Sequence, residues 1–221
     1  TTALGRAIRF KADDVRVFRG RDSTGVRGVR LQDGDEVISM AILGRVDASP
    51  EERAAYVKHA NAMRKALAGA EGEEDSSVET SNEVEDDVAD AVLSVERIAE
   101  LGAAEQFILT VTETGFGKRS SAYEYRRTGR GGQGLTAHGL GGRAGTRLAA
   151  SFPVEESDDL LLVTSGGQMI RTRMDQVRIV GRSSQGVTIF RTAEGEKVVS
   201  VERLPESGGD DVADGESGTP E

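Results

Sequence analysis

The residues of this sequence best suited to chemistry are arginines that stand beside glycines. The densest group is the segment 126–134, with the sequence RRTGRGGQG. It places three cations, Arg126, Arg127 and Arg130, on a loop whose glycines let the backbone come close to a phosphate. Contacts of this kind position a nucleic-acid duplex without reading its bases. The pattern favours binding of a phosphate backbone, and a mobile, solvated basic loop is the alternative.

The same loop also matches the letters G-x-G-x-x-G at 129–134. A dinucleotide site with this motif requires a buried strand before it, a helix after it and an acidic residue about 20 positions further on. The preceding residues 125–128 are YRRT, and the following LTAHG at 135–139 is a poor helix. We therefore expect no nucleotide or other cofactor to bind this segment.

Groups that could perform catalysis or bind a metal are scarce. The chain has no cysteine, which excludes disulfides, thiolate zinc sites and thiol nucleophiles. His59 and His138 have no ligand spacing to each other and are predicted to be surface residues. Tyr123 and Tyr125 alternate in a predicted strand and are expected to pack against neighbours. We predict no catalytic residue and no metal site.

Three copies of one repeat position the arginines. Each copy begins at a glycine, has an arginine four residues later and a second arginine seven residues after that, and then a second glycine followed by an apolar residue. The aligned positions are Gly5, Gly115 and Gly167; Arg9, Arg119 and Arg171; Arg16, Arg126 and Arg178; and Gly28, Gly134 and Gly186. Because two identical gaps recur in all three copies, we interpret the pattern as a true internal repeat. Alternatively, the second arginine of each copy could have a structural role and pair with carboxylates of the strands.

Each copy is predicted to be a set of strands. The segments 107–111 and 160–163 are short, apolar and bounded by turn residues, and Asp33-Gly34 is a hairpin signal. A repeat of about 40 residues with roughly four strands is typical of a propeller blade. We predict an all-β, propeller-like fold with blades at 1–43, 106–154 and 155–204. The first copy lacks its leading apolar strand, so the chain is expected to start inside a blade.

The net charge of −10 is unevenly distributed. The three copies together have 22 Lys/Arg and 16 Asp/Glu, whereas 44–105 has 6 and 16, and 205–221 has none and 6. Ser49-Pro50-Glu51-Glu52 predicts a helix near 50–68 in this acidic insertion. The remaining acidic part of the insertion and the tail 205–221 are expected to be disordered, and as mimics of DNA they could cover the basic surface. No long apolar run or signal peptide is present, so a cytoplasmic protein without a membrane partner is expected.

Three stretches carry a resemblance to a known family. They are TGVRGVRL at 24–31, GFGKR at 115–119 and IVGRSSQGV at 179–187, which is followed by RTAE at 191–194. They resemble the C-terminal domain of the A subunit of DNA gyrase, a type IIA topoisomerase. The resemblance implies a six-bladed β-pinwheel, a relative of the propeller, of which this chain supplies the last three blades.

The resemblance also implies a function. Double-stranded DNA would wrap around the basic rim of the blades, and the whole enzyme, an A2B2 assembly with a gyrase B-type subunit, would introduce negative supercoils. ATP and Mg²⁺ would belong to other parts of that enzyme, and this segment would have no reaction of its own. The DNA-binding residues predicted on this basis are Arg9, Arg27, Lys118, Arg119, Arg126, Arg127, Arg130, Arg171, Arg173 and Arg182.

Two departures leave alternatives open. The glutamine-arginine-arginine-glycine-glycine-lysine-glycine box of the gyrase family belongs to its first blade, and the loop at 127–134 is a degenerate copy with Gln133 where a lysine would stand. The equivalent C-terminal domain of topoisomerase IV is the nearest alternative, although the acidic tail and the box-like loop in a late blade disfavour it. A propeller whose arginines meet an acidic protein partner is another.

Overall fold

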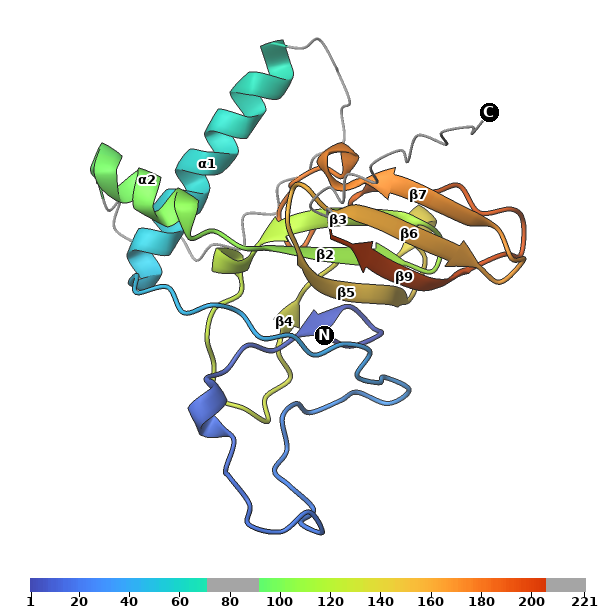
Figure 1. The fold of residues 1–221 in the computed structure, drawn as a ribbon, viewed down its shortest axis with the longest axis horizontal. Helices are drawn as coiled ribbons and strands as arrows, with labels where there is room; N and C mark the ends of the chain where they lie inside the picture. Colours follow the sequence, from blue (N-terminus) through green and yellow to red (C-terminus); the bar gives the residue numbers. More distant parts are fainter. Residues whose placement is uncertain (71–91, 206–221) are drawn as a thin grey trace, which may run out of the picture.

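The computed structural model describes residues 1–70 and 92–205, which form three antiparallel sheets with a pair of helices beside them (Figure 1). The segments 71–91 and 206–221, which include most of the sequence expected to be disordered, lie outside the described residues. The sheets have the strand orders β1-β4, β5-β2-β3-β8 and β7-β6-β9. The strands are β1 (Arg6–Ala7), β2 (Phe107–Thr112), β3 (Phe116–Ser121), β4 (Leu135–Thr136), β5 (Leu148–Val154), β6 (Asp159–Thr164), β7 (Met169–Arg173), β8 (Val187–Thr188) and β9 (Val198–Leu204).

The two apolar segments predicted to be strands are the central strands β2 and β6. Each pairs on both sides, β2 with β3 and β5, and β6 with β7 and β9. Because alternate side chains of a strand point to the same face, these strands deliver apolar residues in pairs to the interior. The resulting core is shared by the second and third copies, and its fully buried members include Leu109, Val111, Leu160, Leu162 and Met174. The predicted fold class is confirmed.

The sheets exchange strands between copies. β8 comes from the third copy but pairs with β3 of the second, through Gly117↔Val187. In the same way β4 comes from the second copy and pairs with β1 of the first, through Ala7↔Leu135. The second and third copies thus each extend the segment after their second glycine onto the preceding copy. The blade boundaries drawn from the repeat did not predict this exchange, because they assumed sheets that are contiguous in sequence.

The first copy has little regular structure. Its Thr2↔Val37 bridge matches Thr112↔Leu148 and Thr164↔Val198 in the other copies, at the same irregular position of each strand pair. Beyond Val37, however, the segment 38–43 pairs with no strand among the described residues. Met40 and Ile42 are consequently 91% and 89% exposed. These apolar side chains stay exposed because no neighbouring strand in the described part of the chain covers them.

A short 3-10 helix replaces the strand predicted around Tyr123 and Tyr125, and similar 3-10 helices lie in the other two copies. They occupy equivalent positions in the three copies: η1 (Ala12–Asp14), η2 (Ala122–Glu124) and η4 (Met174–Gln176). Each ends where the next backbone N–H bonds to the carbonyl of its first residue. The strand prediction was wrong here because alternation over three residues is too short a pattern to separate a strand from a tight turn. A further 3-10 helix, η3 (Gly142–Ala144), lies in a glycine-rich loop.

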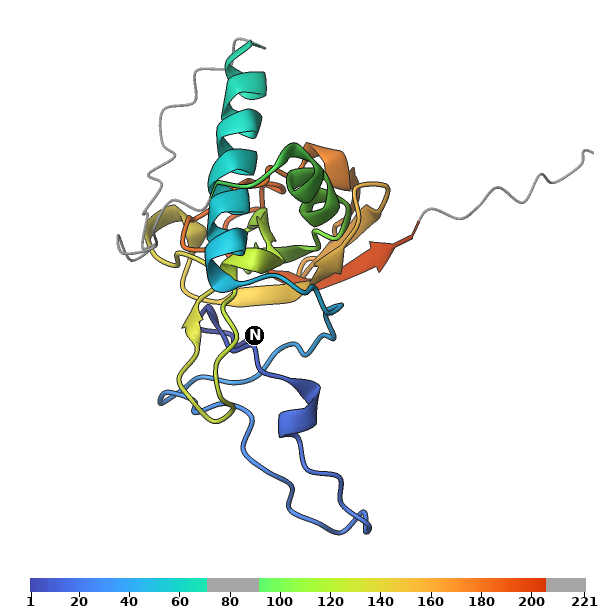
Figure 2. The ribbon, with the colours of Figure 1, turned by 90° about the vertical axis from the view of Figure 1, so that its left-hand side faces the viewer.

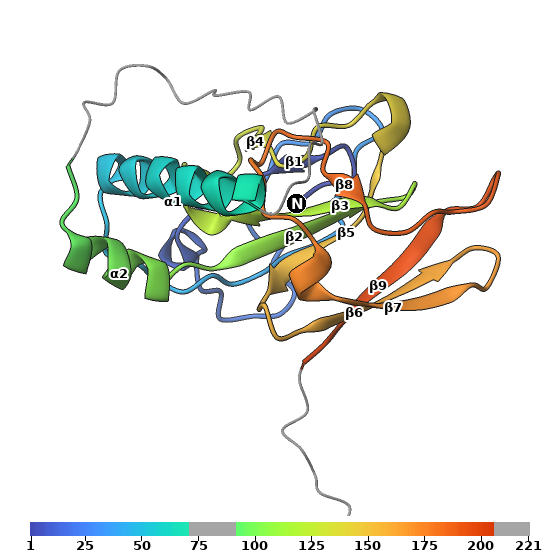
Figure 3. The same cartoon turned by 90° about the horizontal axis from the view of Figure 1, so that it is seen from above.

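The insertion supplies both α-helices, α1 (Pro50–Ala70) and α2 (Val95–Ala103), which lie side by side at one end of the sheets (Figures 2 and 3). α1 begins with the capping box expected from the sequence. Glu52 N–H donates to Ser49 Oγ at 3.2 Å, and Ser49 N–H donates to Glu52 Oε2 at 2.8 Å. Of the described helices, none combines the length and the apolar character needed to cross a membrane.

Candidate nucleic-acid interface

The first glycine of each copy makes the same tight turn. Gly5, Gly115 and Gly167 have φ values of +74°, +81° and +83°. In each case the glycine N–H bonds to the carbonyl of the threonine three residues earlier, at 3.0–3.1 Å. A residue with a Cβ is disfavoured at such φ values, so the turn explains why this glycine recurs.

The second glycine lets consecutive copies approach each other. We call these contacts joints: the first joint is formed by residues 6–9 with 122–136, and the second by 116–121 with 177–188. A Cβ on Gly134 would lie 2.3 Å from the carbonyl oxygen of Ala7, and one on Gly186 would lie 2.5 Å from that of Gly117. Only glycine permits this spacing, so the repeat signature encodes the contact between copies.

The second joint is closed by Arg119. Its backbone N–H donates to Arg178 O at 2.9 Å, and its carbonyl accepts from Val180 N–H at 2.9 Å. The side-chain Nε donates to Val177 O at 2.7 Å, and the guanidinium lies 5.9 Å from the ring centre of Phe107. Arg119 is only 4% exposed. The guanidinium of Arg119, a predicted DNA contact, is therefore buried in this structure and faces the next copy.

Arg9 occupies the same place in the first joint. Its Nη1 donates to Ala122 O at 2.7 Å and lies 3.4 Å from Tyr125 O, the position equivalent to Val177. Its carbonyl accepts from Thr128 N–H at 2.8 Å. Arg9 is half-buried, so its Nη1 joins the copies and only part of its charge faces outward.

The third arginine of this series, Arg171, has a different environment. It lies on β7, at the edge of its sheet, and no further copy follows it among the described residues. Its Nε donates to Asp159 Oδ2 at 2.6 Å, and its side chain is exposed. The neighbouring Arg173 is also exposed and pairs with Asp175. Both predicted DNA-binding residues are partly neutralised by these carboxylates.

Lys118, also predicted as a DNA contact, is completely buried in this structure. Its Nζ donates to Gly181 O at 2.8 Å and to Ser184 O at 2.9 Å, and it also contacts the carbonyl of Arg182. Burial lowers the pKa of Lys118 to about 7, with a smaller opposite effect from Glu124. The three carbonyl oxygens favour the ammonium form, because each accepts one of its hydrogens. Lys118 therefore fixes the 181–184 loop of the third copy.

Arg182 is half-buried in that loop. Its Nη1 donates to Thr136 O at 2.7 Å, and its backbone N–H donates to Glu124 Oε2 at 2.8 Å. The same carboxylate lies in the buried region near Lys118, and burial raises the pKa of Glu124. The guanidinium is thus used largely to hold two copies together.

His138 is buried rather than exposed, contrary to the surface position predicted for it. Its Nδ1 lies 2.9 Å from Thr110 Oγ1, and its Nε2 lies 2.9 Å from Gln185 O. A carbonyl can only accept, so we assign the neutral tautomer with the proton on Nε2 and the threonine hydroxyl as donor to Nδ1. Burial, followed by the charge of Lys118, lowers the pKa of His138 to about 3.

Three of the predicted residues have guanidinium groups without a hydrogen-bond or ion-pair partner in the described part of the chain. These are Arg27, Arg126 and Arg127, and all are exposed. The loop that contains Arg126 and Arg127 forms backbone hydrogen bonds with the segment of the first copy that contains Arg27. Gly131 N–H donates to Gly28 O at 2.6 Å, and Arg30 N–H donates to Gly132 O at 2.8 Å.

Arg130 adds to that arrangement. Its Nε donates to Asp14 O at 3.0 Å and its Nη1 to Arg27 O at 3.1 Å. The residue is nevertheless exposed, so its charge remains near Arg27 on the surface of the first joint. Hydrogen bonds consequently tie the loop to the first copy while its cations remain exposed, as the phosphate-binding interpretation requires.

A fifth cation near this loop, Arg53 on α1, was not predicted from the sequence. α1 packs against η2, immediately before Arg126 and Arg127. The charges within the insertion are unevenly distributed. Residues 50–70 have four Lys/Arg and two Asp/Glu, whereas residues 71–91 have no Lys/Arg and ten Asp/Glu. Counting charge over the whole insertion concealed a basic helix.

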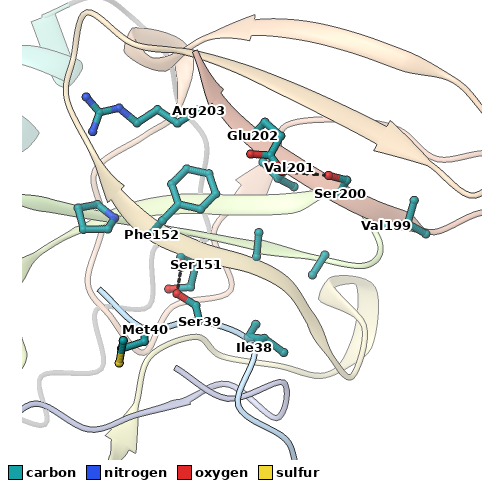
Figure 4. A pocket seen from close by; sticks show the side chains of 13 residues that line it. Ile38, Ser39, Met40, Ser151, Phe152, Val199, Ser200, Val201, Glu202 and Arg203 are labelled. Atoms are coloured by element: carbon teal, nitrogen blue, oxygen red, sulfur yellow. Dashed lines mark hydrogen bonds between the residues drawn. The ribbon is translucent and has the colours of Figure 1, made fainter. Parts of the chain in front are cut away.

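A groove of about 680 Å³ lies on another part of the surface, between the segment 38–40, β5 and β9 (Figure 4). Most of its lining residues are small or apolar, and the acidic Glu202 is also among them. The single cation in its lining, Arg203, pairs with Asp158 at 2.9 Å. These features do not suit a phosphate backbone. The described residues also contain no group of three or more His, Asp or Glu that could hold a metal ion.

Comparison with known proteins agrees with this architecture. The family described as "DNA gyrase C-terminal domain, beta-propeller" matches residues 1–43, 106–139 and 158–205, and its match omits the insertion. The DNA gyrase A subunit of Granulibacter bethesdensis is 55% identical over 200 residues, which cover 90% of this chain and 21% of that protein. Its counterpart from Rickettsia bellii is 44% identical over 215 residues, 97% of this chain and 22% of that protein. The chain spans about a fifth of the length of these relatives.

Solved structures show the same fold. The C-terminal domain of DNA topoisomerase IV superposes with a TM-score of 0.60 at 17% identity, covering 92% of this chain and 45% of that one. The DNA gyrase A C-terminal domain superposes with a TM-score of 0.56 at 21% identity, covering 92% and 48%. Since the family match takes in all three repeats, the chain belongs to the DNA gyrase C-terminal domain family and presents three repeats of its β-propeller.

Proposed function

We propose that this chain binds double-stranded DNA through its phosphate backbone and wraps it, as the C-terminal part of a gyrase A-type subunit. In this proposal the complete enzyme, assembled with a gyrase B-type subunit in the cytoplasm, uses ATP to introduce negative supercoils. The chain supplies the wrapping surface, whereas ATP, Mg²⁺ and the residues that break DNA belong to other parts of the enzyme.

One observation carries the proposal: Arg27, Arg126 and Arg127 are exposed and have no side-chain partner among the described residues, and backbone hydrogen bonds hold their two segments together beside the first joint. Cations without partners are suited to neutralise phosphates, because no existing ion pair has to be broken first. Such phosphate contacts would position a duplex without selecting a sequence. Membership of the family supports the same conclusion. The sequence relatives reported above are gyrase A subunits by name, which favours gyrase over topoisomerase IV.

Ligation of nicked circular DNA in the presence of the complete subunit tests this proposal. If the protein wraps DNA, the closed circles have a shifted linking number after the protein is removed. The double variant Arg126→Gln/Arg127→Gln should reduce the shift and weaken binding. Each lost phosphate contact should lower the slope of log affinity against log salt by about 1.

Lys197→Gln is the matched control. Lys197 is exposed but already pairs with Glu113 at 2.9 Å, so its loss should leave the topoisomers unchanged. An unchanged topoisomer distribution at saturating wild-type protein would overturn wrapping. Affinity that hardly depends on salt would instead favour a propeller that recognises a protein partner.

A further inference from the structure

The insertion has no role in the function proposed so far, although it is firmly attached to the second copy. The Tyr56 and Tyr123 rings meet edge to face, with centres 5.4 Å apart. Tyr56 OH donates to Glu105 Oε2 at 2.9 Å, and Arg64 Nη2 reaches the same oxygen at 2.8 Å. Leu101 of α2 is completely buried against the tyrosines. α1 is therefore held in a defined position on the repeat.

That position brings three arginines together around η2. Arg9 Nη1 donates to Ala122 O, the first residue of η2, at 2.7 Å. Arg127 follows η2 by three residues, and its backbone forms a bridge with that of Arg9. Arg53 stands in the first turn of α1, the helix that packs on η2. The three side chains come from the first copy, the second copy and the insertion.

The charges of these arginines act on one another. Burial, followed by the charges of Arg53 and Arg127, lowers the pKa of Arg9. Burial and then Arg127 lower the pKa of Arg53, and Glu51 acts in the opposite direction. Glu51 is itself engaged by the Ser49 hydroxyl at 2.6 Å. No carboxylate in the described residues forms an ion pair with any of the three arginines.

Like charges placed together without a counterion are unfavourable, and an anion that binds between them relieves the repulsion. Arg9 is occupied by carbonyl oxygens, whereas Arg127 is exposed and Arg53 is half-buried with only its Nε bonded, to Ser49 O at 3.3 Å. We infer that Arg53 and Arg127 form a phosphate-binding site with Arg9 behind them, so that the insertion contributes directly to the DNA path. This inference rests on the proposed function and extends its surface from the repeats onto α1.

DNA binding by the complete subunit, measured at two salt concentrations, tests this site. The variants are Arg53→Gln, Arg127→Gln and the two combined, with Lys65→Gln as the control. Lys65 is an exposed cation on another face of the same helix. We expect each single variant to weaken binding about threefold to tenfold and to lower the salt slope by about 1, whereas Lys65→Gln changes affinity less than twofold. The double variant should lose less than the product of the single losses, because both residues bind one phosphate.

Arg53→Lys separates charge from structure. It should restore most of the affinity, and protease resistance of the insertion should be equal in all variants. Equal losses in Lys65→Gln and Arg53→Gln would overturn the site, since they would show a general effect of helix charge. Wild-type binding that depends on salt but survives Arg53→Gln would overturn only this inference. Wild-type binding without salt dependence would overturn both the site and the proposed function.

Discussion

Arg119 at the second joint and Arg171 at the edge of the third copy occupy the same position of the repeat but have different environments. Arg119 is buried and donates to a carbonyl of the next copy, whereas Arg171 is exposed and pairs with a carboxylate of its own sheet. Their sequence positions within the repeat are identical. The presence of a following copy is what distinguishes them, so the repeat arginine acts as a connector between copies wherever a neighbour is available.

The receiving side of the joint shows the same dependence. Val177 and Tyr125 are 1% and 3% exposed, because each is covered by the preceding copy, while the equivalent Val15 is 47% exposed. A position in this repeat is therefore buried or exposed according to its neighbours and not according to its own residue type. Stability is shared between adjacent copies, as expected for repeat architectures.

Substitution of glycines gives the largest expected contrast between a joint and an open turn. Gly186 and Gly195 have similar φ values of +75° and +78°, but only Gly186 has atoms within reach of an added Cβ. Gly186→Ala should cost about 3–4 kcal/mol of unfolding free energy, from backbone strain and overpacking, and Gly195→Ala about 1 kcal/mol, from strain alone. Urea unfolding of both variants measures the difference. Equal losses would show that close approach at the second joint contributes nothing.

Substitution of the equivalent arginines of the second and third copies gives the next largest expected contrast. Arg119→Leu should destabilise the protein by about 2–3 kcal/mol, because it leaves the buried carbonyl of Val177 without its donor. Arg171→Leu removes an exposed ion pair and should cost less than about 1 kcal/mol. Hydrogen exchange at Val180 N–H, which bonds to Arg119 O, reports the joint directly. Faster exchange in Arg171→Leu than in Arg119→Leu would contradict the assigned roles.

The smallest expected effect concerns the pH dependence of stability that is due to His138. The pKa of His138 is lowered to about 3 in the folded protein, so between about pH 6.5 and 3 the unfolded chain binds a proton that the folded one does not. Its contribution to stability is present above pH 6.5 and is lost as the pH falls. Between pH 7 and 5 the loss should be about 2 kcal/mol greater in the wild type than in His138→Gln, as measured by urea unfolding. Parallel stability curves for the two proteins would instead show that His138 takes up its proton equally in the folded and unfolded chains.

Much of the fold could be predicted because it depends on short-range rules. Apolar runs gave the central strands β2 and β6, and the capping box located the start of α1. The candidate site was harder to predict. Lys118 and Arg119 looked like surface cations, since nothing in the local sequence shows that a loop about 60 residues away will surround them. His138 was misplaced for the same reason: its partners, Thr110 and Gln185, come from distant segments.

The sequence by itself determined the threefold repeat, the turn glycines and the uneven distribution of charge, because each depends on residue type and spacing along the chain. Only the tertiary structure decided which arginines are connectors and which are free. Strand exchange places the middle of each copy against the start of the preceding one, so carbonyl groups reach Arg9 and Arg119 but leave Arg126 and Arg127 exposed. The packing of α1 against η2 likewise decided that an overall acidic insertion presents a cation to the same surface.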